Sequence, residues 1–116
     1  MTELLHITES TTWSAARSEG EYRMSTRGVT LDEQGFIHCG LSHQLRPVAE
    51  RLYGDTAEDL VVLRIDGDKL TAPVRFEAPE PGAEEFPHVY GPIPVDAVVE
   101  AIPVGRDADG RLILPE

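Results

Sequence analysis

The run Asp59–Asp66 (DLVVLRID) constrains the fold of this chain most, because it is the clearest strand in the sequence. Its apolar residues are almost continuous, which is typical of a well-buried strand at the centre of a sheet. Shorter strands are expected around it, separated by turn residues. They are residues 3–8, 35–40, 74–77, 88–91 and 111–114, while residues 95–104 fit either a strand or a helix.

Two short helices are expected. The first follows Ser10, Thr11 and Thr12, each of which could cap it, and ends at Gly20. The second runs over residues 42–53, and Pro47 predicts that its first turn is irregular or that the regular helix begins near Arg46.

Residues 21–34 lack periodicity and are predicted to form a loop, with a short strand at Tyr22–Ser25 as an option. Because strands outnumber helices and the helices come early, the predicted class is α+β. We expect one small domain over residues 1–116, with a hairpin-like tail at 105–116.

The composition excludes several classes of protein. The 116 residues include 10 Lys and Arg and 21 Asp and Glu, a net charge of −11, which disfavours nucleic acid and anionic membranes as partners. No apolar run approaches the ~20 residues of a transmembrane helix, and the N-terminus does not resemble a signal peptide. With a single cysteine, Cys39, the sequence predicts a reduced, cytoplasmic protein.

The negative charge is unevenly distributed. Residues 54–116 carry 5 basic and 14 acidic side chains, a charge of −9, whereas residues 1–53 carry 5 and 7, a charge of −2. A small anionic ligand in the first half is therefore compatible with the total, although a polyanion spanning the surface is not.

Three of the four histidines, His6, His38 and His88, lie inside predicted strands. Each alone is explained by a core histidine hydrogen-bonded to the backbone. Their shared surroundings of glycine, threonine, cysteine and aromatic residues favour a common site, since glycine in a strand often marks close approach to a ligand.

The spacing does not demand a metal ion. His38 and His43 are five residues apart and do not form the HExxH pattern, and a set of His6, Glu77 and His88 has no diagnostic spacing. We predict no metal. Cys39 is expected to be buried and inert, because neighbouring strand residues point to opposite faces and His38 cannot easily activate it.

The stretch of residues 85–94 (EFPHVYGPIP) is the most distinctive in the chain. Alternation along a strand places His88 and Tyr90 on one face, where they suit proton transfer or stacking; the alternative is a rigid edge strand with an ordinary tyrosine. Phe36 and Glu77 lie in or beside the same strands and predict an apolar pocket with a few polar groups. Arg23 and Arg27 could clamp a phosphate or carboxylate, or could be solvated surface charges.

Several stretches carry a resemblance to a known family over about residues 3–104. They are His6-Ile7-Thr8, Trp13 with Ala16 and Gly20-Glu21-Tyr22, Gly35-Phe36-Ile37-His38-Cys39, Leu60–Asp66 and Phe86-Pro87-His88-Val89-Tyr90-Gly91-Pro92. Together they resemble the domain of unknown function 952 family, and the GFIHC and FPHxYGP motifs are the specific part. The family usually has serine where this chain has Gly40.

The resemblance implies a fold similar to the ADP-ribosylation fold, a split antiparallel sheet with two short helices whose cleft holds NAD in the enzymes. It does not imply their activity. By position, His6 resembles the first-strand residue that holds a ribose, and His38 loosely resembles the second-strand residue. Neither Glu77 nor Glu85 aligns with the late catalytic glutamate, and His88 and Tyr90 stand in that region instead. This departure resembles the tRNA 2′-phosphotransferase branch, whose RNA substrate is disfavoured by the charge of −11.

Three hypotheses for function stay open, all with a small-molecule ligand. The first is an ADP-ribosyltransferase-type cleft that binds NAD or another nucleotide-like ligand, with NAD as the candidate cofactor. The second is a non-NAD acid–base enzyme of isomerase, cyclase or lyase type, and the third is a non-catalytic binding or regulatory module. The predicted catalytic residues are His38, His88 and Tyr90, and the predicted ligand-binding residues are His6, Thr8, Arg23, Arg27, Phe36 and Glu77.

Overall fold

The computed structural model describes residues 3–115, and its largest sheet has four antiparallel strands. They are β1 (Glu3–Glu9), β6 (Leu60–Asp66), β10 (Val98–Arg106) and β11 (Leu112–Ile113), in the order β1-β6-β10-β11. The prediction of a central strand at 59–66 is confirmed, because β6 pairs with β1 on one side and β10 on the other. The ambiguous residues 95–104 form a 3₁₀ turn, Val95–Ala97, followed by β10.

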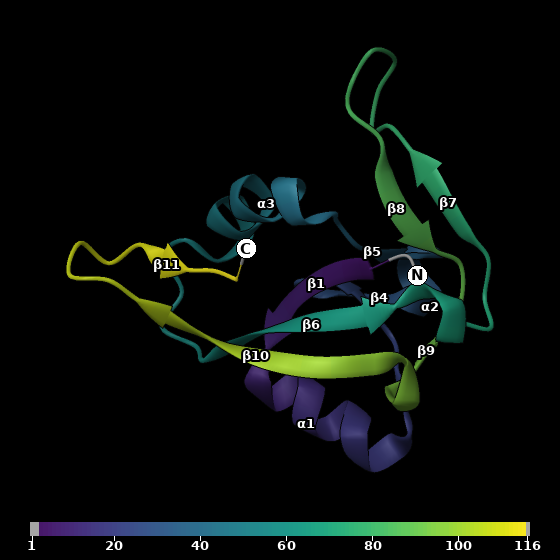
Figure 1. Cartoon of the computed structure of the whole chain (residues 1–116), viewed down its shortest axis with the longest axis horizontal. Helices are drawn as coiled ribbons and strands as arrows, with labels where there is room; N and C mark the ends of the chain where they lie inside the picture. Colours follow the sequence, from purple (N-terminus) through teal and green to yellow (C-terminus); the bar gives the residue numbers. More distant parts are fainter. Residues whose placement is uncertain (1–2, 116) are drawn as a thin grey trace.

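Helices cover both faces of this sheet, as Figure 1 shows. Helix α1 (Ser10–Glu19) buries Trp13 and Ala16 against Val61, Leu63 and Ile65 of β6. Helix α3 (Leu45–Tyr53) follows a 3₁₀ turn at Ser42–Gln44 and packs against Leu60 and Val62. Residues 60–63 are continuously apolar because alternate residues of β6 enter two different cores.

A second antiparallel sheet has the order β5-β8-β7. Its strands are β5 (Ile37–His38), β8 (Phe86–Val89) and β7 (Val74–Glu77), and β7 and β8 rise away from the first sheet in Figure 1. An isolated bridge between Leu5 and Gly40 connects the two sheets. The register pairs His38 directly with His88, so the topology brings two of the predicted site residues side by side.

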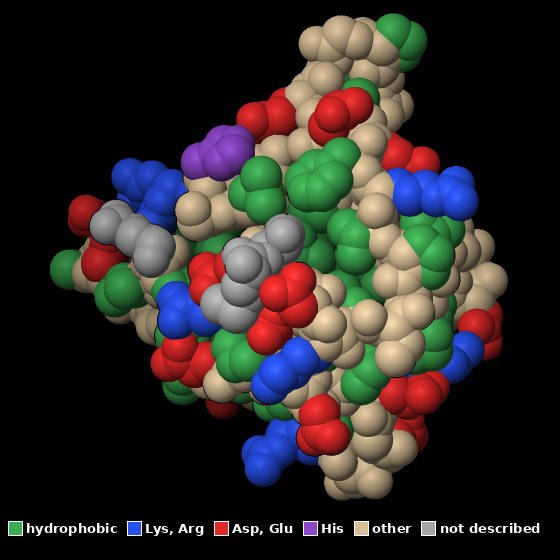
Figure 2. All heavy atoms as spheres, turned by 45° about the vertical axis from the view of Figure 1, so that its right-hand side comes forward, with side chains coloured by type: hydrophobic (Ala, Val, Ile, Leu, Met, Phe, Trp, Pro, Cys, Tyr) green, Lys and Arg blue, Asp and Glu red, His purple; other side chains and the backbone are tan. Residues whose placement is uncertain are grey.

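Strand β7 is the edge of the second sheet, and a 3₁₀ turn at Gly67–Lys69 lies between β6 and β7. The sequence predicts one wet face for β7, yet Arg75 and Phe76 are both exposed, Phe76 by 45%. Figure 2, in which the right-hand side of Figure 1 comes forward, shows hydrophobic side chains gathered near the centre of the visible side of the molecule, with charged side chains around them. Strand β7 is therefore more exposed than predicted, because within residues 3–115 it pairs with β8 alone.

The segment 21–34 is more regular than the predicted loop. It contains β2 (Glu21–Tyr22), β3 (Met24–Thr26), β4 (Val29–Thr30) and helix α2 (Leu31–Gln34). Strand β2 pairs with β9 (Ile93–Pro94), and β3 pairs with β4. The described residues thus form three α-helices, not two, although the predicted α+β class is confirmed.

A capping box explains α2. The hydroxyl oxygen of Thr30 accepts a hydrogen bond from the Glu33 N–H at 3.2 Å, and the Thr30 N–H donates to Glu33 Oε1 at 3.0 Å. These bonds satisfy two groups at the helix start. The Thr30 N–H, and after it the Thr30 hydroxyl, which also donates to Glu33 Oε1 at 3.0 Å, lower the pKa of Glu33.

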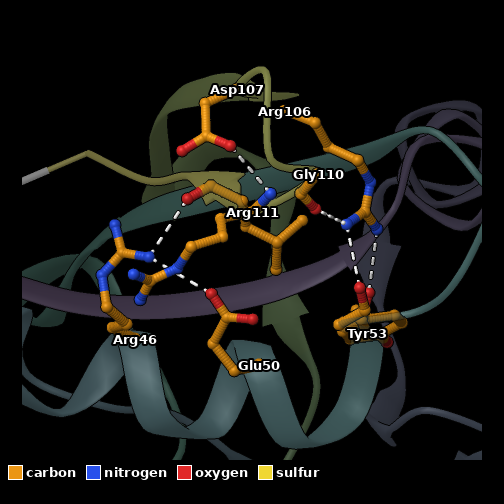
Figure 3. A network of polar contacts seen from close by, with 9 residues as sticks. Arg46, Glu50, Tyr53, Arg106, Asp107, Gly110 and Arg111 are labelled. Atoms are coloured by element: carbon orange, nitrogen blue, oxygen red, sulfur yellow. Dashed lines mark hydrogen bonds and ion pairs between the residues drawn. The ribbon is translucent and has the colours of Figure 1, made fainter.

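The C-terminal hairpin is attached to the end of α3 (Figure 3). The Arg106 guanidinium donates to the carbonyl oxygens of Tyr53, Thr56 and Gly110 at 3.0, 2.8 and 2.8 Å, and to that of Gly54 at 2.9 Å. From the other side, Arg46 donates to the Leu112 carbonyl at 3.1 Å. Carbonyls at a helix C-terminus lack partners within the helix, so Arg106 satisfies groups that would otherwise need water.

Within residues 3–115, no helix has the length and apolar character needed to cross a membrane.

Candidate functional site

A cavity of about 610 Å³ is lined by α3, by the middle of β1, and by residues of β5, β7 and β8. We call it the histidine cavity, because His6, His38 and His88 are among its lining residues. Side chains of α3, Phe36 and Phe86 contribute much of its apolar wall. The volume is within the range of ligand pockets, roughly 300–1,000 Å³.

The rings of four predicted site residues cluster here: His38, His88 and Phe36 line the cavity, and Tyr90 lies beside them but is not among the described lining residues. The imidazoles of His38 and His88 lie 5.2 Å apart between centroids, edge to face. The Phe36 ring stacks on His88 at 4.1 Å and lies 5.3 Å from the Tyr90 ring. The sequence thus correctly indicated that His88 and Tyr90 share a face, and Phe36 joins them because β5 is hydrogen-bonded to β8.

His88 is held by a carboxylate. Its Nδ1 donates to Glu77 Oε1 at 2.8 Å, and the Tyr90 hydroxyl donates to the same oxygen at 2.5 Å. These hydrogen bonds, the Tyr90 bond first, lower the pKa of Glu77, and Glu77 in turn raises the pKa of Tyr90. Because Nδ1 carries the proton, Nε2 of a neutral His88 is the unprotonated nitrogen.

His38 is held in a similar way by Ser25. Its Nδ1 is hydrogen-bonded to the Ser25 hydroxyl at 2.9 Å. Burial is the main reason for the lowered pKa of His38, followed by the charges of His88 and Arg51 and opposed by hydrogen bonding to the Ser25 backbone. His38 is therefore a neutral imidazole at neutral pH.

The Nε2 atoms of both histidines have no hydrogen-bond partner among residues 3–115. In the same part of the chain, Arg64 Nε is the one fully buried side-chain nitrogen or oxygen without a hydrogen bond, so neither histidine Nε2 is a fully buried atom. Both Nε2 atoms are consequently accessible from outside the protein, and both residues line the histidine cavity. The result is a pair of imidazoles anchored at Nδ1 and open at Nε2.

His6 differs, because both of its ring nitrogens are occupied. Nδ1 donates to the His38 carbonyl at 2.5 Å, so Nε2 accepts a hydrogen bond from the Tyr22 hydroxyl at 2.7 Å. Burial lowers the pKa of His6 to about 4 and raises that of Tyr22. Although His6 borders the cavity, its geometry is that of a residue that positions β5.

Three other predicted ligand-binding residues lie outside the cavity wall. Thr8 is buried, and hydrogen bonding to it acts on the pKa values of Tyr22 and Tyr53. Arg27 donates to the Leu52 carbonyl at 2.5 Å, with its guanidinium 5.2 Å from the centroid of the Tyr53 ring. Arg23 forms ion pairs with Glu21 at 2.7 Å and Asp32 at 2.9 Å.

Arg23 belongs to a separate depression of about 380 Å³ beside α1, which we call the α1 hollow. Its lining includes Thr12, Ala16, Glu21, Tyr22 and Asp32. The structure therefore does not bring Arg23 to the histidines.

Arg51 is the charged residue of the described cavity lining that sequence reasoning missed. It lines the histidine cavity from the last turn of α3, and it makes no hydrogen bond or ion pair with any of residues 3–115. Its spacing from Val48 and Leu52 places all three on neighbouring positions of one helical face. That periodicity was the available signal, but the sequence alone does not show which part of the helix meets a cavity.

Within residues 3–115, no group of three or more His, Cys, Asp or Glu side chains is arranged so that it could hold a metal ion. His43 is exposed and pairs with Glu84 at 2.9 Å. Cys39 is buried, as predicted, and burial raises its pKa to about 12. A thiol with so high a pKa supplies little thiolate, the form that acts as a nucleophile.

The fold and the histidine cavity define a small α+β protein of a recognisable family. The chain belongs to the family described as "Protein of unknown function (DUF952)", whose model matches residues 7–101. The predicted resemblance is thereby confirmed. No curated protein matches the chain.

Solved structures of protein CC0527 from Caulobacter crescentus are similar to this chain. The X-ray structure has a TM-score of 0.82 at 29% identity and covers 97% of this chain and 95% of that one. The crystal structure of a double mutant of CC0527 gives a TM-score of 0.81 at 28% identity with the same coverage. The solution NMR structure gives 0.74 at 29% identity, covering 96% and 91%.

Proposed function

We propose that the histidine cavity binds a small organic metabolite and moves a proton on it, with His88 and His38 as the acid–base pair. The observation that carries the proposal is the two adjacent imidazoles, each anchored at Nδ1 and without a partner at Nε2 among the described residues. Imidazole exchanges protons near neutral pH, so this chemistry requires no cofactor.

His88 acts as the base in this mechanism. Glu77 fixes its Nδ1–H tautomer, and the unprotonated Nε2 accepts a proton from the bound metabolite. The Glu77 carboxylate stabilises the imidazolium that forms, and the proton returns to another atom of the metabolite or to water. Glu77 is a positioning residue here, because both of its hydrogen bonds at Oε1 go to protein side chains.

His38 has a different task, because its surroundings differ. As a neutral imidazole beside His88, it hydrogen-bonds the atom of the metabolite at which charge develops, or relays the proton. Phe36 and Phe86 provide apolar walls that limit water around the reacting atoms. This division fits reactions that shift a proton, such as isomerisation, cyclisation or elimination.

An NAD-type or other nucleotide-like ligand in an ADP-ribosylation-like fold is the second candidate. The stacked Phe36 and His88 rings favour it, since aromatic faces suit a planar base or nicotinamide ring. The division of the described strands into separate antiparallel sheets, the two largest of four and three strands, supports the split fold. We rank it second because His6 has no free ring nitrogen for a ribose and Arg23 and Arg27 lie outside the cavity wall.

Solvent deuterium provides a test that works before the substrate has been identified. The protein is incubated in D₂O with a mixture of small cellular metabolites, and mass spectrometry detects deuterium entering C–H positions or a change of isomer. We expect His88→Gln to slow the reaction by ~100-fold or more, the usual contribution of an acid–base group. His43→Gln is the matched control, because His43 is exposed and does not line the cavity.

The same incubation separates the alternatives. Full activity in His88→Gln would remove the proposed base. Release of nicotinamide from added NAD would favour the second candidate. Binding of a metabolite, seen as a raised melting temperature, without any chemical change would indicate a non-catalytic module.

A further inference from the structure

We infer that the metabolite bound in the histidine cavity is a small organic carboxylate with a single negative charge, whose carboxylate pairs with Arg51. This inference rests on the proposed function and names the substrate class of that site.

The first step is the state of the Arg51 guanidinium. Arg51 is the one Lys or Arg among the described lining residues of the histidine cavity. It has no ion pair or hydrogen bond within residues 3–115, whereas Arg23 has two carboxylate partners and Arg106 has four carbonyl partners. Its five N–H donors are thus available to a planar anion, which a guanidinium binds through two parallel hydrogen bonds.

The second step is the charge balance of the wall. Glu77 is the one Asp or Glu among those described lining residues, and its Oε1 is engaged by His88 and Tyr90. The described lining therefore contains one arginine and one carboxylate, in a protein of net charge −11. A phosphate dianion would carry a second charge with no cation in the described wall to compensate it, so a monoanion fits best.

The third step is the surface beside Arg51. Val48 and Leu52 lie three residues before and one after it on α3, and both line the cavity. Phe86 and Pro79 contribute further apolar surface to the same wall. A ligand held at one end by a guanidinium and flanked by these groups needs an apolar or planar body.

Arg51 also has a purely structural explanation. It lies in the last turn of α3, where a positive side chain stabilises the helix dipole. A test based on stability alone would not separate the two roles, so the readout must be the preference for charge in a ligand.

Matched fragments provide that readout. Benzoate, its neutral counterpart benzamide, and phenyl phosphate are titrated into ¹⁵N-labelled protein up to about 10 mM, followed through the shifts of cavity-lining amides. Phenylacetate and phenylacetamide form a second pair with a longer reach. We expect the carboxylates to bind at least tenfold more tightly than the amides, and more tightly than phenyl phosphate.

Arg51→Gln should abolish this preference, and Arg51→Lys should restore part of it. Arg17→Gln is the control, because Arg17 lies in the last turn of α1 and the substitution removes the same charge from a helix end. The control should keep the full preference. Equal binding of carboxylate and amide by the wild type, no carboxylate binding, stronger binding of phenyl phosphate, or an unchanged preference in Arg51→Gln would each overturn the inference.

The two proposals fail separately. If carboxylates show no preference while His88→Gln still abolishes deuterium exchange, the acid–base function holds and the substrate class is wrong. If Arg51-dependent carboxylate binding is present without exchange, the ligand class holds and the catalytic function is wrong.

Discussion

The histidine cavity and the α1 hollow each have one arginine among their described lining residues, but they differ in whether its charge is already paired. In the α1 hollow, Arg23 is paired with Glu21 and Asp32. In the cavity, Arg51 has no partner among the described residues and two histidines keep one nitrogen each unpaired. For the two arginines, the comparison teaches that the presence or absence of charge partners separates a candidate ligand-binding residue from a paired surface charge.

One hydrogen bond forms part of the wall between the two regions. His6 borders the histidine cavity, Tyr22 borders the α1 hollow, and they are joined by the 2.7 Å bond between Nε2 and the hydroxyl. His6 also supports the His38 carbonyl. His6, whose two ring nitrogens are both occupied, therefore helps to position His38, one of the proposed catalytic histidines.

Removing the carboxylate of the cavity is expected to have the largest effect. Glu77→Gln should slow deuterium exchange by ~100-fold, because the amide no longer enforces the Nδ1–H tautomer of His88 or stabilises its charged form. The ¹⁵N shifts of the His88 imidazole should change with it. Arg23→Gln, a change in the α1 hollow, should leave the rate unaltered, and equal losses in both variants would contradict the contrast between the two regions.

Acid is expected to lower the stability of the folded protein through His6, which lies in the wall between the two regions. Its pKa is lowered from 6.5 to about 4, so the unfolded chain takes up the proton first as pH falls. The free energy of unfolding keeps its full value with respect to His6 above about pH 6.5. It falls by about 3 kcal/mol as the pH approaches 4. His38, whose pKa is also lowered, adds to the loss in the same direction.

Urea unfolding at pH 7.5 and pH 4.5 measures this loss. His6→Gln should reduce the pH dependence, whereas His43→Gln, at an exposed position, should keep it. A wild-type stability that does not change across this interval would show that His6 is not held neutral.

Removing the Tyr22 hydroxyl should have a smaller effect on the same wall. Tyr22→Phe leaves the buried His6 Nε2 without a donor, which should cost about 1–3 kcal/mol of unfolding free energy. Tyr90→Phe is the comparison, since the Tyr90 hydroxyl lies nearer the surface and water can replace it. Equal losses of unfolding free energy in the two variants would show that the buried bond between His6 and Tyr22 contributes no more than the exposed one.

Much of this organisation could be predicted from local sequence. Strand β6, helix α1 with its end at Gly20, and the shared face of His88 and Tyr90 all follow from periodicity and turn residues. That His38 and His88 lie together was only a hypothesis, because it depends on pairing between β5 and β8, which are far apart in the sequence.

The misses have two physical causes. Helix α2 was overlooked because its four residues are too few for periodicity, although Thr30 and Glu33 form a capping box that the sequence displays. The second cause concerns the arginines. Arg23 and Arg27 were expected at the site and Arg51 was not. Whether an arginine is already paired depends on residues from distant parts of the chain, which local sequence does not reveal.

The Arg106 guanidinium at the end of α3 extends the functional unit beyond the family match. Residues 102–116 lie outside that match, yet Arg106 and the Leu112 carbonyl hold the helix that presents Val48, Arg51 and Leu52 to the cavity. Relatives that differ only in this tail could therefore select different ligands with an identical set of cavity residues. We therefore expect chimaeras that exchange the tail between relatives to differ in ligand specificity while the proposed chemistry is kept.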